Sequence, residues 1–232
     1  MVTRSSLILV FALAFAFFIL APPFLGQPFP IYPDMHWADV LDVLTPLVLI
    51  PLYWLLFTDS GRLRRTLNAV VTFLVLAALW TEGQGMHLSA NSINNLLGEG
   101  STSLNQLVHF YDEVLSHYLW HIGVAGLSVL LVAVAWEPHS STSRLPWAVI
   151  VPAAILYGFT YFAAINEGGT VPFGLPAAAL IAIGLVAFRR RELRDYNLTA
   201  FFFWAYVVAL LLFAIWGIWQ GGFPEFTEAG LL

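Results

Sequence analysis

The sequence predicts an all-α, polytopic membrane protein that forms a bundle of seven transmembrane helices. Of its 232 residues, 59% are hydrophobic and 10% are charged, whereas a soluble domain carries about 25% charged residues. Long apolar stretches recur along the chain, and most of them reach the roughly 20 residues that a bilayer-spanning helix needs. All nine basic residues are arginines, and their clusters fit on one side of a membrane.

Seven apolar stretches define the predicted helices, and we expect residues 1–232 to form a single transmembrane domain. The predicted spans are approximately residues 5–21, 38–57, 67–92, 106–136, 146–166, 174–188 and 198–219. The first span has the arginine and the apolar run of a signal peptide, and we interpret it as a retained signal-anchor. Five prolines between residues 22 and 33 predict an extended loop after it.

The arginine clusters set the expected orientation, because arginine is enriched in cytoplasmic loops. With the N-terminus in the cytoplasm, the loops after the second, fourth and sixth spans are cytoplasmic as well. Every basic residue then lies inside: Arg4, Arg62, Arg64, Arg65, Arg144, Arg189, Arg190, Arg191 and Arg194. The C-terminus is therefore expected outside the cytoplasm. An even number of spans would be inconsistent with the last arginine cluster.

Composition excludes several classes of protein. There is no cysteine, which rules out disulfides, thiolate metal sites and a cysteine nucleophile. The absence of lysine removes the Schiff base that a retinal protein needs. The net charge of −5 gives no reason to expect nucleic acid as a partner. The use of arginine without lysine suggests a GC-rich prokaryotic genome, so a prokaryotic plasma membrane is the expected location.

Unusual polar residues lie within the third and fourth predicted spans. In the fourth span, His109, Glu113, His117 and His121 recur every fourth residue and therefore share one helix face. Asp112 and Glu113 point about 100° apart on an α-helix, so only one of them is expected to enter a site on that face.

The third span contributes Glu82 and His87. Spans three and four are antiparallel and are joined by a polar loop near residues 93–106. Counting back from that loop places Glu82 at the level of His117 and His121, and His87 near Asp112 and Glu113. The acid of one helix is thus expected to face the imidazoles of the other.

Charged groups inside a bilayer are costly, about 2.5–3.5 kcal/mol each on lenient scales, so they face the bundle interior and are paired. A divalent metal satisfies imidazole and carboxylate groups together. We therefore predict a metal site, with zinc favoured over iron or manganese. The predicted metal ligands are His87, His117, His121 and Glu82.

The same residues predict a hydrolytic mechanism. Glu82 or Glu113 would act as the general base on a metal-bound water, whose pKa the metal lowers. Asp112 would hold one histidine in the required tautomer. These three carboxylates, Glu82, Asp112 and Glu113, are the candidate catalytic residues.

Seven spans, no cysteine and three intramembrane histidines with an acid resemble the superfamily of alkaline ceramidases and adiponectin receptors. The matching positions are His87, the pair His117-x-x-x-His121, and Asp112. The resemblance implies a seven-helix zinc hydrolase that acts on a lipid amide. The order differs, since the family carries its histidine pair on the last helix and has a serine where this chain has Gly83.

The leading interpretation is a metal-dependent membrane enzyme, a zinc hydrolase working in the extracytoplasmic half of the bilayer. Its expected partners are membrane lipids and a small amphipathic substrate. One alternative is a haem-binding or other redox subunit, with His87 and either His117 or His121 as axial ligands. The other is a non-enzymatic transporter or accessory subunit. A polar path through the membrane is disfavoured, because the arginine-side halves of the helices contain few polar residues.

Overall fold

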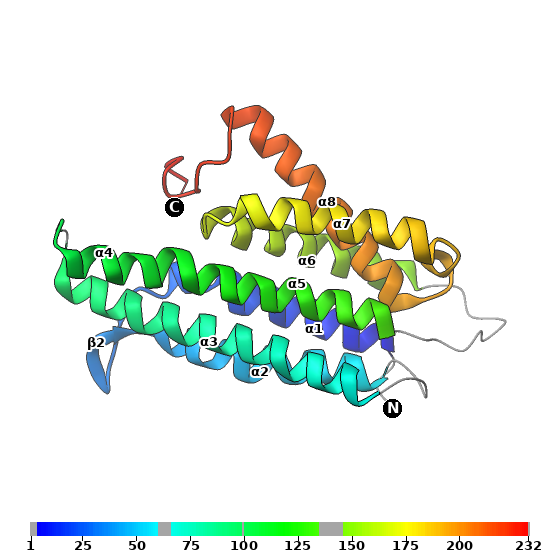
Figure 1. Ribbon diagram of the computed structural model, residues 1–232, viewed down its shortest axis with the longest axis horizontal. Helices are drawn as coiled ribbons and strands as arrows, with labels where there is room; N and C mark the ends of the chain where they lie inside the picture. Colours follow the sequence, from blue (N-terminus) through cyan, green and yellow to red (C-terminus); the bar gives the residue numbers. More distant parts are fainter. Residues whose placement is uncertain (1–3, 60–65, 99, 135–145, 232) are drawn as a thin grey trace.

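Long helices packed side by side make up the computed structural model, which describes residues 4–59, 66–98, 100–134 and 146–231. Figure 1 shows most of the helices running along the length of the molecule, with α8 tilted away from the others. Four of the arginines on which the predicted orientation depends lie outside the described residues. They are Arg62, Arg64, Arg65 and Arg144.

Within the described ranges, six helical runs are long and apolar enough to cross a membrane. One of them is continuous through α4 (Ser103–His109), η2 (Phe110–Leu115) and α5 (Ser116–Val134). The others are α2 (Trp37–Asp59), α3 (Leu67–Leu97), α6 (Trp147–Glu167), α7 (Val171–Arg189) and α8 (Asn197–Gln220). The chain is therefore a helical, polytopic membrane protein, as its composition predicted.

The first helix, α1 (Arg4–Leu20), is also apolar but has only 17 residues. It packs against α2, α6 and α8, and its side chains form part of the core. Phe11 meets the ring of Tyr53 edge to face, with 4.6 Å between the centroids. Phe15 stacks on Tyr157 at 4.5 Å. The segment that resembles a signal peptide is thus built into the bundle.

Helices α3 and α5 share the most extensive contact between described helices, and glycines permit their approach. A Cβ on Gly83 would lie 2.6 Å from the main chain of Ser116 and of Trp120. A Cβ on Gly123 would lie 2.8 Å from the carbonyl oxygen of Leu76. Such contacts are too short for any side chain, so the two main chains touch because these positions are glycine.

α3 continues to Leu97, beyond the predicted end at residue 92, through residues expected to form a loop. Its 31 residues extend roughly 46 Å, which exceeds the hydrocarbon thickness of a bilayer. The Ser89 and Ser92 hydroxyls donate to carbonyl oxygens one turn earlier, at 2.9 Å each. These two polar side chains are hydrogen-bonded within the helix. The polar residues therefore made the predicted span too short, although the helix itself continues.

The fourth predicted span begins earlier than expected and is not a uniform α-helix. It starts at Ser103, where the Thr102 side chain accepts a hydrogen bond from the Asn105 amide. Residues Phe110–Leu115 then form the π-helical turn η2. A π turn bonds i→i+5 and so accommodates an extra residue, which shifts the register of the face predicted from the histidine spacing.

Shorter elements connect the long helices. Between α1 and α2 lie the 3₁₀ turn η1 (Pro22–Phe24) and two antiparallel strands, β1 (Pro28–Phe29) and β2 (Tyr32–His36). The 3₁₀ turn η3 (Glu192–Arg194) joins α7 to α8. In Figure 1 the N-terminus and the α7–α8 connection lie at one end of the molecule, and α4 and β2 lie at the other. We call the latter the α4 end.

Candidate functional site

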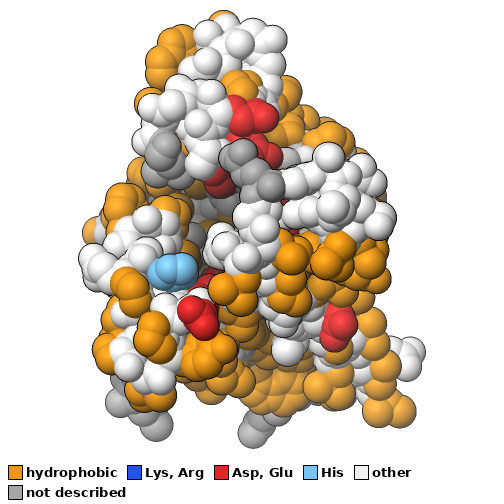
Figure 2. Space-filling view, turned by 90° about the vertical axis from the view of Figure 1, so that its left-hand side faces the viewer, with side chains coloured by type: hydrophobic (Ala, Val, Ile, Leu, Met, Phe, Trp, Pro, Cys, Tyr) orange, Lys and Arg blue, Asp and Glu red, His pale blue; other side chains and the backbone are white. Residues whose placement is uncertain are grey.

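A cavity of about 760 Å³ lies between the helices towards the α4 end. Figure 2 views the molecule from that end and shows a hollow with acidic side chains on its walls. We call its polar and acidic lining residues the polar wall: Asp42, Gln84, His87, Glu113, His117, Glu167 and Glu225. We call its large apolar lining residues the apolar wall, which includes Phe18, Ile19, Leu20, Phe159, Phe162, Trp216 and Phe226.

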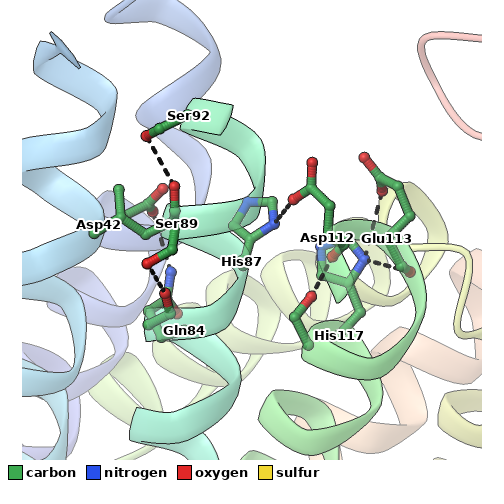
Figure 3. A network of polar contacts seen from close by, with 11 residues as sticks. Asp42, Gln84, His87, Ser89, Ser92, Asp112, Glu113 and His117 are labelled. Carbon is green, nitrogen blue, oxygen red and sulfur yellow. Dashed lines mark hydrogen bonds and ion pairs between the residues drawn. The ribbon is translucent and has the colours of Figure 1, made fainter. Parts of the chain in front are cut away.

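The polar wall includes a histidine held by a buried acid from the neighbouring helix. His87 Nδ1 on α3 lies 2.8 Å from Asp112 Oδ1 on η2, as Figure 3 shows. Asp112 is only 1% exposed, and with a protonated imidazole the contact is an ion pair. The structure thus brings together two residues that the sequence placed at the same depth.

A second polar chain links α2 to α3. The Gln84 amide donates to Asp42 Oδ1 at 3.1 Å, and the Trp80 indole donates to Gln84 Oε1 at 3.4 Å. Asp42 and Gln84 are both buried. Sequence reasoning gave neither a functional role, although a buried acid and amide inside apolar helices are the signal that marks them.

The two histidines of α5 are each engaged by a neighbouring oxygen. His117 Nδ1 lies 3.1 Å from the Glu113 carbonyl oxygen and 3.8 Å from Glu113 Oε2. His121 Nδ1 lies 2.6 Å from the Thr170 hydroxyl. The buried His121 Nε2 has no hydrogen-bond partner among the residues that the structure describes, and His121 is not among the residues lining the cavity.

Asp112 and Glu113 occupy different places, and only Glu113 is among the residues that line the cavity. Asp112 is buried against His87. The two side chains therefore diverge, in line with the expectation that only one of them would enter the site.

Glu82 is not brought to the imidazoles, contrary to the sequence-based placement. Its side chain is on the exposed face of α3, whereas Gly83 and Gln84 face inward. Counting residues from the connecting loop estimates only the depth of Glu82 in the membrane. The direction of the side chain changes by about 100° from one residue of an α-helix to the next. The helix contact at Gly83 determines the rotation, and it points Glu82 away from the cavity.

The predicted metal site is also corrected. Among the residues that the structure describes, no group of three or more histidine, aspartate or glutamate side chains could hold a metal ion. The His117 and His121 rings stack with centroids 5.9 Å apart, and their Nδ1 atoms face separate oxygens. Parallel rings one turn apart do not converge on one ion. Haem binding, the alternative to a metal ion, remains an untested prediction.

The C-terminal segment forms part of the cavity wall, a role that sequence reasoning missed. The main-chain amide of Phe226 donates to Glu167 Oε2 at 2.6 Å. The Asn166 amide and the Trp216 indole both donate to the Pro224 carbonyl oxygen, at 2.9 and 3.0 Å. Residues after α8 therefore fold back onto α6 and carry Glu225 to the cavity.

Glu225 lies outside the membrane-spanning helices and shows the electrostatic character of this wall. Burial, followed by the nearby carboxylates of Glu167 and Glu113, raises the pKa of Glu225. Like charges are therefore concentrated at this end of the cavity.

A buried hydroxyl cluster deeper in the bundle was also missed. The Tyr53 and Tyr157 hydroxyls are 2.9 Å apart, and Ser128 Oγ lies 3.0 Å from the Tyr157 hydroxyl. Tyr206 packs beside them, and its hydroxyl has no partner among the described residues. These residues do not line the cavity, and we regard them as part of the core.

Comparisons with known proteins identify the chain's relatives. The family model described as ceroid-lipofuscinosis neuronal protein 6 matches residues 77–222. The chain is 27% identical over 242 residues to the ceroid-lipofuscinosis neuronal protein 6 homolog of Canis lupus familiaris. It is 26% identical over 243 residues to ceroid-lipofuscinosis neuronal protein 6 of Homo sapiens. Each alignment covers 95% of this chain and 72% of the relative. No solved structure matches.

These matches overturn the resemblance to alkaline ceramidases and adiponectin receptors, which rested on a few positions and a helix count. The prediction of a zinc hydrolase falls with it, because neither the family match nor the arrangement of the histidines supports one. The catalytic roles assigned to Glu82, Asp112 and Glu113 stay untested. The expected prokaryotic plasma membrane has no support either, since both relatives are mammalian.

The family match covers most of the polar wall. Residues 77–222 include Gln84, His87, Glu113, His117 and Glu167, and leave out only Asp42 and Glu225. The matched region is well over half of the chain. The protein belongs to the ceroid-lipofuscinosis neuronal protein 6 family.

Proposed function

We propose that this protein is a non-enzymatic accessory protein of a membrane that holds a small amphipathic molecule in the cavity at its α4 end. The observation that carries the proposal is that polar, acidic and large apolar side chains line the same cavity. Its volume of about 760 Å³ lies within the roughly 300–1,000 Å³ typical of small-molecule sites.

The contacts of the polar wall support a binding role. His87 is held by Asp112, His117 by the Glu113 main chain, and Asp42 by Gln84. Side chains fixed by neighbours in this way are pre-organised, which reduces the entropy lost when a ligand binds. The chain's membership of a family other than the zinc hydrolases also favours this alternative.

A seven-span arrangement, with the N-terminus in the cytoplasm and the C-terminus outside it, is part of the proposal. The 17 residues of α1 extend about 25 Å, close to the thickness of a bilayer core. Its burial against α2 and α6 supports a membrane position. The described arginines Arg4 and Arg189 sit at the end opposite α4, which orients the cavity away from the cytoplasm.

The binding proposal is tested with a dansyl-tagged single-chain amphiphile added to the purified protein in nanodiscs. Binding is read as energy transfer from tryptophan, since Trp216 lies in the apolar wall. Ala163→Trp fills the cavity and is expected to weaken binding by about tenfold or more. Ala148→Trp, at an exposed position on the same helix α6, is the matched control and should bind like the wild type. Equal binding by both variants would place the amphiphile elsewhere and end the proposal.

A further inference from the structure

The cavity has an unusual balance of charge. Four of its lining residues carry carboxyl groups, and no arginine is among them: the acids are Asp42, Glu113, Glu167 and Glu225. Figure 2 shows acidic and histidine side chains around the hollow and no arginine among the described residues on that face. The chain's basic residues are all arginines, and those described begin α1 or surround the α7–α8 connection, far from the cavity.

Asp42 is the most informative of the four acids. It is only 8% exposed and lines the cavity. Its Oδ1 accepts the hydrogen bond from Gln84, which holds the carboxyl group at the cavity lining. A buried carboxylate is costly unless a positive group lies near it. The cavity is a space that can admit such a group.

Three of the acids, Glu113, Glu167 and Glu225, lie near one another. Glu167 is held by the Phe226 amide, and Glu225 follows Pro224 in the segment that folds onto α6. Burial raises the pKa of Glu225, and repulsion by the nearby carboxylates of Glu167 and Glu113 raises it further. A positive group bound among these carboxyls would relieve that repulsion.

The apolar wall is suited to a hydrocarbon chain and to a cation beside it. The Phe162, Trp216 and Phe226 rings pack together, with 4.9 Å between the centroids of Trp216 and Phe226. Aromatic faces attract cations as well as apolar groups. Phe226, one of these three aromatic residues, directly follows Glu225 in the sequence.

We infer that the ligand of this cavity is a cationic amphiphile, a single apolar chain that ends in a protonated amine. The amine would lie beside the carboxyl groups that line the cavity, and the hydrocarbon chain would follow the apolar wall. A primary amine supplies three donors and a full charge near neutral pH. This inference rests on the proposed amphiphile-binding function and adds the charge of the ligand.

The test compares three amphiphiles of equal hydrocarbon chain length that differ in the head group: dodecylamine, dodecanol and dodecanoate. Each competes with the dansyl-tagged amphiphile in nanodiscs, with partition into protein-free nanodiscs subtracted. Dodecylamine is expected to bind about tenfold more tightly than dodecanol, and dodecanoate more weakly than both, because the cavity charge is negative.

Charge-neutralising variants locate the effect. Asp42→Asn and Glu225→Gln are each expected to weaken dodecylamine binding by about fivefold and to leave dodecanol binding unchanged. Asp34→Asn removes an exposed acid from β2, at the same end of the molecule but outside the cavity. This control should change neither dodecylamine binding nor dodecanol binding. Thermal unfolding followed by tryptophan fluorescence confirms that each variant is folded. Glu225 lies after α8, so its variant remains usable if Asp42→Asn does not fold.

The outcomes separate this inference from the proposed function. If dodecanol binds as tightly as dodecylamine, or if the two cavity variants leave amine binding unchanged, the cationic ligand is wrong and amphiphile binding stands. If neither the dansyl probe nor any of the three competitors binds, both proposals fall.

Discussion

At the scale of single residues, two glycines on one turn of α3 have opposite surroundings. A Cβ on Gly83 would lie 2.6 Å from main-chain atoms of Ser116 and Trp120, whereas a Cβ on Gly85 would meet nothing within 4 Å. Main-chain atoms in a packed helix do not move aside as a flexible side chain does. Gly83 is therefore required for the α3–α5 contact, and Gly85 is not required for packing within the chain.

We predict that Gly83→Ala destabilises the protein and Gly85→Ala does not. Overpacking at Gly83 should cost about 1–3 kcal/mol, while alanine at Gly85 should gain up to about 1 kcal/mol through helix propensity. Thermal unfolding of the two purified variants, followed by tryptophan fluorescence, measures the difference. Equal melting temperatures would mean that α3 and α5 are not in contact at Gly83.

At the scale of elements, the exposed face of α3 is the least expected surface of the fold. Glu82 lies at the middle of this 31-residue helix and points outward. Ala78, Gly85 and Ser89 are exposed on the same side, at spacings that keep them on one helix face. A carboxyl group facing lipid at this depth costs about 2.5–3.5 kcal/mol, and small neighbours permit close helix contact.

We therefore predict that another membrane helix covers this face in the cell, which would agree with the proposed accessory role. A photo-crosslinking amino acid placed at Gly85 should give an adduct in native membranes, and Glu82→Leu should reduce its yield severalfold by removing the polar contact. A crosslinker at Leu180, which is 71% exposed on α7, is the control position and should react with lipid alone. The mass of the adduct distinguishes a second copy of this chain from a different protein. The absence of a protein adduct at Gly85 would contradict the prediction.

At the scale of the whole molecule, the proposed arrangement in the membrane rests on the helix order and the arginine positions. The chain has no cysteine, so each introduced cysteine is the only thiol. Gly26, Arg191 and Thr227 are all exposed and lie in different connections or in the C-terminal segment. They therefore report the side of the membrane independently.

In sealed vesicles, an added N-terminal cysteine and Arg191→Cys should react with an impermeant thiol reagent from the cytoplasmic side. Gly26→Cys and Thr227→Cys should react only from the opposite side. Quantitative labelling before and after permeabilisation provides the measurement. An N-terminal cysteine labelled on the same side as Gly26→Cys would show that α1 does not cross the membrane.

Much of the fold was predictable because burial in lipid demands long apolar segments, and such segments are visible in any sequence. The depth match between His87 and Asp112 was also predictable, because antiparallel neighbours can be counted from their connecting loop. The rotation of each helix was not predictable in this way. It depends on which residues permit close contact, and Gly83 turned Glu82 outward and Gln84 inward.

The sequence by itself determined that this is a helical membrane protein whose polar groups gather in spans three and four, because hydropathy and spacing act locally along the chain. Only the tertiary structure decided that His87, Glu113 and His117 line a cavity and that, within the described ranges, they form no metal site. Asp112 is buried against His87. The packing of α2 and of the C-terminal segment added Asp42 and Glu225. Contacts between distant segments set these positions, and no local pattern encodes them.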